Sequence, residues 1–310
     1  MSKQAVVLFS GQGAQKVGMG KDLAEAFPSA KELTARADSA LGFPLSATMF
    51  EGPIEDLTKT SRCQPALFVH GLAVLGVLKE RVPALEITAC AGLSLGEFTA
   101  HAAAGTFDFE TGLRLVHQRG TFMEEACEQT RGAMAAMIGG EESAVRELAA
   151  QCDVDVANLN APGQIVLSGS VAGIEAAVAG AKAKGIVKAI PLTVAGAYHS
   201  RLMKSAQEKL ATVLQNTEMR APAVPVICNF EARAVRDAAD IRRTLASQVT
   251  GSVRWAESLA SLVAQGGSLF LELGPDTAIA GMMKRIDKSA RVISIADVAG
   301  LEKAAAELSA

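Results

Sequence analysis

Short apolar runs rich in β-branched residues alternate with longer stretches of helical periodicity along almost the whole sequence. The runs expected to form strands are 6–9, 87–91, 134–138, 154–158, 165–167, 186–192, 224–228, 269–273 and 291–295. The stretches expected to form helices include 65–78, 113–128, 145–151, 171–184, 202–214 and 278–286. Because strands that alternate with helices usually join one parallel sheet with helices on both faces, this pattern predicts an α/β fold.

One segment departs from the alternation. Between residues 131 and 194 the expected order is strand, helix, strand, strand, helix, strand. The Pro162-Gly163 step is typical of a turn and separates the two middle strands. This order is that of a ferredoxin-like unit. We therefore predict a ferredoxin-like small domain at 131–195, inserted into a large α/β domain made of 1–130 and 196–310.

Composition and charge exclude several classes of protein. Of the 310 residues, 49% are hydrophobic and 20% charged, which is typical of a globular chain and not of a disordered one. The net charge is −3, and proteins that neutralise many phosphates are usually basic, so nucleic acid is disfavoured as a partner. No apolar stretch approaches the roughly 18 residues of a membrane span, and the run at 5–9 is too short for a secretory signal. The sequence predicts a cytoplasmic protein.

The cysteines agree with this location. They are Cys63, Cys90, Cys127, Cys152 and Cys228. Their number is odd and no Cys-x-x-Cys pair occurs, so we expect buried reduced thiols and neither a disulfide framework nor a metal site.

A serine lies between two glycines in the segment Gly92-Leu93-Ser94-Leu95-Gly96. An expected buried strand precedes this segment, and a helical stretch at 97–104 follows it. That context is typical of a nucleophile elbow, in which glycines allow a tight turn and the helix N-terminus directs backbone N–H groups towards the serine oxygen. We expect Ser94 to be a catalytic nucleophile.

A serine hydroxyl needs a base, and the chain has four histidines. His70, His101 and His117 lie inside expected helices, where packed or half-exposed structural histidines are common. His199 instead follows the strand at 186–192 and a loop of small residues, where a side chain can reach across a cleft. We expect His199 to be the base.

The group that orients this histidine is left open by the sequence. Asp108, Asp153 and Asp155 lie between Ser94 and His199, but none has the context of a buried triad member. A backbone carbonyl can also orient an imidazole, so a dyad and a triad both remain possible.

Two further features suggest chemistry at the same site. Arg119 lies on the apolar side of an expected helix, where it either forms an internal salt bridge or clamps a substrate carboxylate. The glycine-rich segment 11–15 follows the first strand but lacks dinucleotide-binding spacing and a P-loop lysine. Such a loop can direct a backbone N–H towards a developing oxyanion.

Taken together, these segments resemble the malonyl-CoA:acyl carrier protein transacylases and the related acyltransferase domains of polyketide synthases. The matching segments are Gly11-Gln12-Gly13-Ala14-Gln15, Gln64-Pro65-Ala66-Leu67, Ser94-Leu95-Gly96-Glu97, Arg119-Gly120 with Phe122-Met123, 158–163 with Gln164, Gly196-Ala197-Tyr198-His199-Ser200 with Leu202-Met203, Val253-Arg254-Trp255, and Glu272-Leu273-Gly274-Pro275. They occur in the family order over about residues 5 to 290, essentially the whole chain.

The resemblance implies an α/β-hydrolase-like large domain with a ferredoxin-like insertion. It implies these roles: Ser94 as nucleophile, His199 as base, Gln12 and Leu95 as oxyanion-hole N–H donors, Arg119 as the malonyl-carboxylate ligand, Met123, Asn160 and Tyr198 as acyl-pocket residues, Gln248 as the residue whose carbonyl orients His199, and Gln64 as a polar residue behind the site. Two positions depart from the family pattern. Leu93 stands where histidine is usual, and Tyr198 where phenylalanine is usual.

The resemblance also implies the reaction. A malonyl group would pass from malonyl-CoA to Ser94 and then to the phosphopantetheine thiol of acyl carrier protein, with no bound cofactor. A cytoplasmic monomer that serves fatty acid synthesis is the favoured setting, and a trans-acting polyketide system is an alternative.

Two other functions remain open at this stage. A serine hydrolase or thioesterase would share the elbow, with water resolving the acyl-enzyme. A non-catalytic relative would only dock a carrier protein, for which Lys182, Lys184 and Lys188 offer a basic patch.

Overall fold

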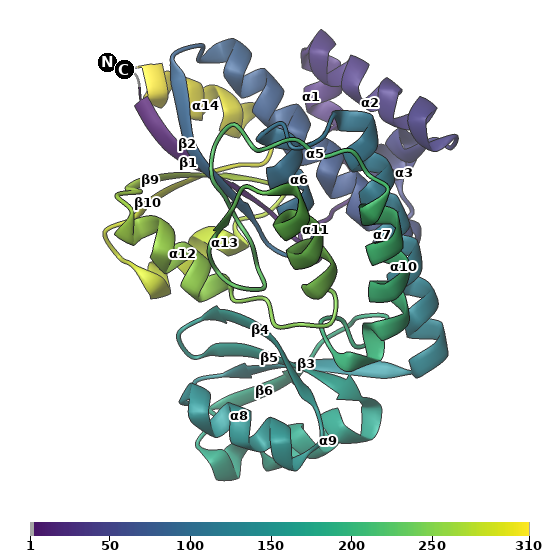
Figure 1. The fold of residues 1–310 in the computed structure, drawn as a ribbon. Helices are drawn as coiled ribbons and strands as arrows, with labels where there is room; N and C mark the ends of the chain where they lie inside the picture. Colours follow the sequence, from purple (N-terminus) through teal and green to yellow (C-terminus); the bar gives the residue numbers. More distant parts are fainter. Residues whose placement is uncertain (1–2, 310) are drawn as a thin grey trace.

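The computed structural model of the chain describes residues 3–309, and its larger part is built on a six-stranded sheet (Figure 1). The strands are β1 (Lys3–Phe9), β2 (Leu85–Gly92), β7 (Val226–Ile227), β8 (Ala234–Val235), β9 (Leu269–Leu273) and β10 (Arg291–Ile295). Their order is β10-β9-β1-β2-β7-β8, and all neighbours are parallel except the β7–β8 pair. The predicted α/β class with a parallel sheet is confirmed. The two-residue strand β8 was not predicted, because it is too short to show a periodic pattern.

Helices cover both faces of this sheet, as predicted. Val7 and Phe9 of β1 pack into one hydrophobic cluster with residues of α5 and α14, whereas Val6 and Leu8 pack into another with residues of α12 and α13. The helices of this part are α1 (Lys21–Ala26), α2 (Pro28–Leu41), α3 (Leu45–Glu51), α4 (Ile54–Thr58), α5 (Thr60–Arg81), α6 (Leu95–Ala103), α7 (Phe109–Thr130), α10 (Lys204–Gln215), α11 (Ala238–Ser247), α12 (Trp255–Ala264), α13 (Ala278–Ile286) and α14 (Val298–Ser309). A central strand buried on both faces explains the continuous apolar run at its C-terminal half.

Helix α5 corrects one expectation from the sequence. Its 22 residues include an 18-residue window with a mean hydropathy of 1.2, long and apolar enough by composition to cross a membrane. However, 78% of that window is buried inside the fold, where α5 packs against the sheet, α6 and α7. The core of a large α/β domain therefore accounts for the apolar composition of this helix.

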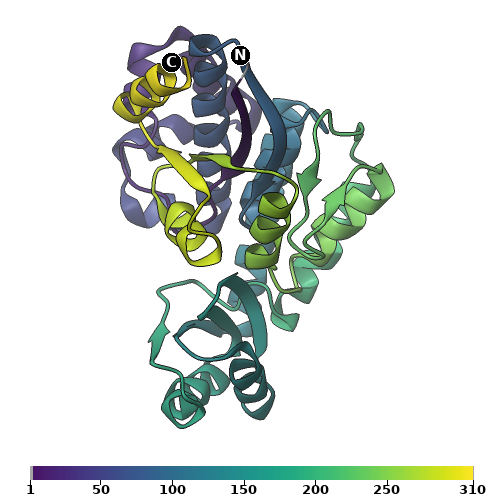
Figure 2. The same ribbon diagram turned by 90° about the vertical axis from the view of Figure 1, so that its left-hand side faces the viewer.

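A four-stranded antiparallel sheet forms the separate lower lobe seen in Figures 1 and 2. Its elements are β3 (Gly132–Ile138), α8 (Glu142–Gln151), β4 (Asp155–Ala161), β5 (Gln164–Ser170), α9 (Val171–Gly180) and β6 (Lys188–Pro191), and the strand order is β4-β5-β3-β6. Apolar residues of α8 and α9 pack on this sheet in a core of their own. The element order matches the one predicted for 131–194, except that the second helix ends at Gly180 and a 3₁₀ turn (Ala181–Lys184) follows.

The register of the central strands determines where the following loops lie. Phe9 at the end of β1 pairs with Gly92 at the end of β2. Because the two strands are parallel, the loop after β1 and the turn after β2 leave the sheet at the same edge. The glycine-rich segment and the serine turn are therefore neighbours.

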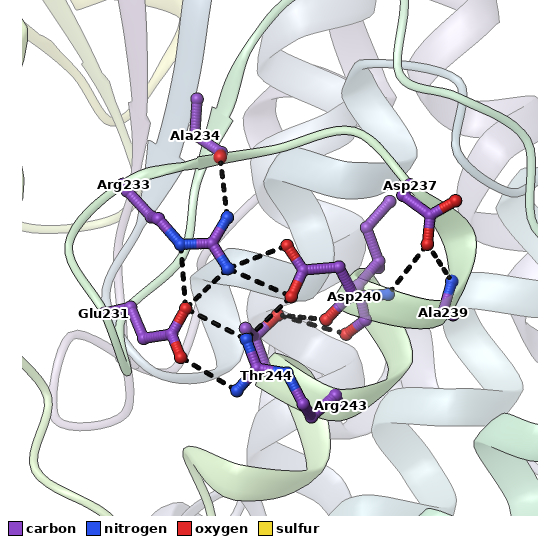
Figure 3. A network of polar contacts seen from close by, with 9 residues as sticks. Glu231, Arg233, Ala234, Asp237, Ala239, Asp240, Arg243 and Thr244 are labelled. Atoms are coloured by element: carbon purple, nitrogen blue, oxygen red, sulfur yellow. Dashed lines mark hydrogen bonds and ion pairs between the residues drawn. The ribbon is translucent and has the colours of Figure 1, made fainter.

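A network of ion pairs joins the β7–β8 hairpin to α11 (Figure 3). Arg233 contacts Glu231 and Asp240 at 2.6 and 2.8 Å, and Arg243 contacts the same two carboxylates at 2.8 and 2.6 Å. Both arginine side chains are about half exposed, so each pair contributes little on its own. Their shared geometry still links two segments that lead into the site described below.

All five cysteines are free thiols. Four are buried as expected, whereas Cys152 at the end of α8 is partly exposed.

Candidate active site

Ser94 lies in a strained turn between β2 and α6. Its φ of 55° and ψ of −103° are values that residues other than glycine rarely adopt. The turn needs both flanking glycines, because a Cβ on Gly92 would lie 2.0 Å from the backbone of Gly96, and a Cβ on Gly96 would lie 2.5 Å from the carbonyl oxygen of Phe9. The elbow geometry predicted from the sequence is present.

His199 reaches Ser94 from a distant part of the chain. Its Nε2 lies 2.8 Å from Oγ of Ser94, and its Nδ1 lies 2.7 Å from the carbonyl oxygen of Gln248. The carbonyl can only accept, so Nδ1 carries the proton and Nε2 is free to accept one from the serine. Of the two arrangements left open by the sequence, the structure contains the one with a backbone carbonyl.

The aspartates considered as triad members lie in other contacts. Asp108 caps the N-terminus of α7, and Asp153 and Asp155 interact with Arg201. Histidines outside the site are packed in helices as expected, with contacts that belong to the core. These contacts are His70 Nε2 to the Ala296 carbonyl, His101 Nδ1 to Thr106 Oγ1, and His117 Nδ1 to the Ser61 carbonyl.

Burial keeps the His199 imidazole neutral. Burial and, to a smaller extent, the nearby positive charge of Arg119 lower the pKa of His199 to about 4, against the opposing effect of the hydrogen bond to Gln248. A neutral imidazole at physiological pH is the form that can take a proton from a hydroxyl group.

Arg119 is a buried cation whose direct hydrogen bonds go to hydroxyl and amide oxygens. Its Nη2 donates to Ser94 Oγ at 2.9 Å and to Gln248 Oε1 at 2.8 Å, and its Nη1 donates to Gln64 Oε1 at 2.7 Å. Among residues 3–309 it forms no ion pair, and its Nε has no hydrogen-bond partner. Burial lowers the pKa of Arg119 to about 10, which leaves the group charged at neutral pH. The internal salt bridge that the sequence left open is therefore absent from the described chain, and a buried guanidinium of this kind favours an anionic ligand.

A cavity of about 720 Å³ opens at Ser94 and lies between the two sheets. Among its lining residues are eight of those singled out from the sequence: Gln12, Ser94, Leu95, Arg119, Met123, Asn160, Tyr198 and His199. Leu93, the departure beside the serine, also lines it. Gln248 and Gln64 contact Arg119 from behind the cavity. The second departure, Tyr198, is held in place by a 2.6 Å hydrogen bond between its hydroxyl and Thr60 Oγ1.

Two residues of the site received no role from sequence reasoning. Asn229, which follows the short strand β7, accepts from the Ser94 N–H at 2.6 Å and donates to the Gly92 carbonyl at 2.8 Å, so it holds the turn from both sides. Glu97 accepts from the Asn229 N–H at 2.9 Å. Glu97 belongs to a motif that carried the resemblance, whereas an isolated asparagine after a strand gives no signal in one sequence.

Comparison with known proteins accords with this geometry. The sequence profile described as the acyl transferase domain matches residues 6–308. The chain belongs to this acyl transferase family. Malonyl CoA-acyl carrier protein transacylase of Bacillus subtilis (strain 168) is 42% identical over 309 residues, which are 98% of this chain and 96% of that protein.

Solved structures of acyl transferases are also similar over nearly their whole length. The acyl-carrier-protein-S-malonyltransferase of Bartonella henselae aligns with a TM-score of 0.94 at 36% identity and covers 99% of this chain and 100% of its own. A malonyl-transacylase solved in complex with a type II PKS acyl-carrier protein aligns with a TM-score of 0.93 at 37% identity, covering 98% and 100%.

Proposed function

We propose that the protein transfers a malonyl group from malonyl-CoA to the phosphopantetheine thiol of acyl carrier protein through a malonyl-Ser94 intermediate. The observation that carries the proposal is the position of Ser94 Oγ, which lies 2.8 Å from the neutral base His199 and 2.9 Å from the buried cation Arg119. The Ser94 oxygen therefore lies beside both a group that can accept its proton and a cation that can bind the carboxylate of an acyl group. Family membership and the names of the relatives support the same reaction.

The first half-reaction forms the acyl-enzyme. His199 Nε2 takes the proton from Ser94, and Oγ attacks the thioester carbonyl of malonyl-CoA. The backbone N–H groups of Gln12 and Leu95, both at the cavity wall, would stabilise the oxyanion. The carbon–sulfur bond then breaks, and the CoA sulfur leaves with the proton that His199 had taken.

The second half-reaction reverses these steps with a different thiol. CoA leaves the cavity, and the phosphopantetheine thiol of the carrier protein enters. His199 accepts the thiol proton, the sulfur attacks the ester carbonyl of malonyl-Ser94, and the proton returns to Oγ as the carbon–oxygen bond breaks. His199 serves as base and acid in turn, and the protein ends unchanged.

Selection of the acyl group rests on Arg119. An acyl chain on Ser94 that ends in a carboxylate can pair with the guanidinium, whereas an uncharged acetyl group leaves a buried cation unsatisfied. Met123, Asn160 and Tyr198 line the cavity and would shape the rest of the acyl pocket.

The finer description of the fold belongs to the same proposal. We infer an α/β-hydrolase-like catalytic domain at 1–130 and 196–310 and a ferredoxin-like domain at 131–195, and the strand order β4-β5-β3-β6 supports the latter. A cytoplasmic monomer that supplies malonyl groups for fatty acid synthesis is the setting that we propose.

Intact-protein mass spectrometry after brief mixing with malonyl-CoA tests the function, with Ser94→Ala in parallel. We expect one malonyl adduct on the wild type, none on the variant, and rapid loss of the adduct when acyl carrier protein is added. Steady release of free CoA without an adduct or a carrier would identify a hydrolase instead. No adduct and no CoA release would contradict any acyl transfer by this chain.

A further inference from the structure

Glu97 is a fully buried carboxylate close to the nucleophile that the mechanism above does not use. It lies in the first turn of α6, after Ser94, and its Oε2 accepts two hydrogen bonds. One comes from the Asn229 N–H at 2.9 Å and the other from Gln248 Nε2 at 2.7 Å. Its Oε1 has no hydrogen-bond partner among residues 3–309. A buried acidic group with one oxygen left without a partner is costly, which points to a role for the contacts of its other oxygen.

The Gln248 side chain connects Glu97 to Arg119. Its Nε2 donates to Glu97 Oε2 at 2.7 Å and, in a longer bond of 3.3 Å, to the Ser94 carbonyl oxygen, and its Oε1 accepts from Arg119 Nη2 at 2.8 Å. A guanidinium has only donors, and the engaged oxygen of Glu97 acts only as an acceptor. A flipped amide would therefore place NH₂ against the guanidinium and oxygen against the carboxylate, losing these two bonds and the longer one to the Ser94 carbonyl. Only one direction of the amide satisfies the two neighbours.

This arrangement is independent of the protonation of Glu97. Burial raises the pKa of Glu97 to about 7, and hydrogen bonds from Asn229 and Gln248 oppose the rise. A proton on this residue can occupy Oε1, which has no other partner, while Oε2 continues to accept. The direction of the Gln248 amide is thus the same in both forms.

We propose that Glu97 is a positioning residue for acyl selection: it accepts the shorter of the two hydrogen bonds that the Gln248 NH₂ group donates, fixes the direction of this amide, and so keeps the Arg119 guanidinium directed at Ser94 and the acyl cavity. The inference rests on the proposed function, because it assumes that Arg119 binds the carboxylate of the acyl group. Arg119 Nη2 donates both to Gln248 Oε1 and to Ser94 Oγ, so loss of the first contact frees the group that makes the second.

The experiment compares single-turnover acylation of Ser94 by malonyl-CoA and by acetyl-CoA. Glu97→Leu removes the acceptor at similar size, and we expect the malonyl-to-acetyl rate ratio to fall about tenfold or more. Glu97→Gln keeps an oxygen at the Oε2 position, and its ratio should stay within about threefold of the wild type. Loss of the Asn229 contact would slow both acylations alike, because both use the same serine, and therefore cancels in the ratio.

Thr106→Val is the matched control. This substitution removes one buried hydrogen bond, to His101 of α6, the helix that also carries Glu97. Thr106 lies outside the cavity. We expect it to lower thermal stability and leave the ratio unchanged. An unaltered ratio in Glu97→Leu would overturn the inference, as would an equal fall in the Thr106→Val or Glu97→Gln variant. Absence of malonylation in the wild type would instead refute the proposed function, and this inference with it.

A second pair of variants tests whether Glu97 acts through the Gln248 amide, and Gln248→Leu by itself gives an answer if Glu97→Leu fails to fold. Gln248→Leu keeps the backbone carbonyl that His199 contacts but removes the amide between Glu97 and Arg119. If Glu97 acts on Arg119 only through this amide, Gln248→Leu and the Glu97→Leu/Gln248→Leu double variant will have the same lowered ratio. A further fall in the double variant, or a normal ratio in both, would overturn the inference.

Discussion

The Oγ of Ser94 lies 2.8 Å from Nε2 of His199, although 105 positions separate the two residues in the chain. Both have left-handed backbone conformations, with φ of 55° and 56°. Residues other than glycine rarely adopt such a positive φ, so the surrounding contacts must stabilise this backbone conformation at both positions. Asn229 holds the N–H of Ser94, and the Gln248 carbonyl holds the ring of His199. The two residues that meet are thus each fixed by a third segment of the chain.

The pH dependence of acylation should reflect the neutral state of His199. Because burial lowers its pKa to about 4, the histidine loses its basic form only as pH falls towards that value. We expect kcat/KM for Ser94 acylation to show no inflection from this residue near 6.5, and an acid limb well below it. Rapid pH-jump mixing would measure the rate before acid unfolding intervenes. An acid limb centred near 6.5 in the wild type would contradict the assignment.

Arg119→Ala should change which acyl group is accepted. Removal of the guanidinium eliminates the partner of a malonyl carboxylate and also removes a buried cation that an acetyl group cannot satisfy. We expect malonyl acylation to fall by about a hundredfold or more and acetyl acylation to be retained or increased. Steady-state kinetics with both thioesters measure the ratio. A ratio equal to that of the wild type would remove Arg119 from the selection of the acyl group.

Gly96→Ala should destabilise the protein through the elbow. The added Cβ would lie 2.5 Å from the carbonyl oxygen of Phe9, and neither backbone segment can move without disturbing the sheet. We expect a loss of about 3 kcal/mol in the free energy of unfolding. Gly76→Ala on α5 is the control, since its Cβ meets nothing within 4 Å. This control should stabilise the protein by about 0.5–1 kcal/mol. Equal denaturation midpoints for the two variants would refute the steric argument.

Stability should fall between pH 6.5 and about 4.5. Burial lowers the pKa of His70 and His199 to about 4 and that of His101 to about 3, so the unfolded chain binds three protons that the folded one excludes. Burial raises the pKa of Glu97 to about 7, which has the opposite sign and offsets one of them, and burial also raises the pKa of Glu272, which acts in the same opposing direction. The net uptake on unfolding is therefore at most two protons, which corresponds to a slope of at most roughly 3 kcal/mol per pH unit in the free energy of unfolding.

Urea denaturation across this pH range measures the slope. Replacement of one buried histidine, as in His101→Asn, should reduce the slope by about 1.4 kcal/mol per unit. A stability that is constant from pH 6.5 to 4.5 would show that the histidines are not neutral in the folded protein.

Local sequence was sufficient for much of the architecture. The strands at 6–9 and 87–91 and the helix at 278–286 were predicted because each has a clear periodicity and a buried face. The turn at Ser94 was predicted because glycine is required on both sides of it. Helices α1 to α4, with few apolar positions or short lengths, and the strand β8 gave no such signal, since tertiary contacts stabilise them more than their own pattern does.

The sequence by itself determined which groups are chemically able to act: a serine in a glycine-bounded turn, a histidine outside the helices, and an arginine on an apolar helix face. Only the tertiary structure decided how they are joined. The Gln248 carbonyl, which only the family resemblance had implied, contacts His199 in the structure, and Arg119 has amide partners instead of an ion pair within the described chain. The tertiary structure also places the Asn229 side chain against the Ser94 N–H and the Glu97 carboxyl against the Asn229 N–H. The physical reason is that hydrogen bonds between segments 49 to 151 positions apart depend on how the sheet and helices pack, and this packing leaves no periodic pattern in the sequence.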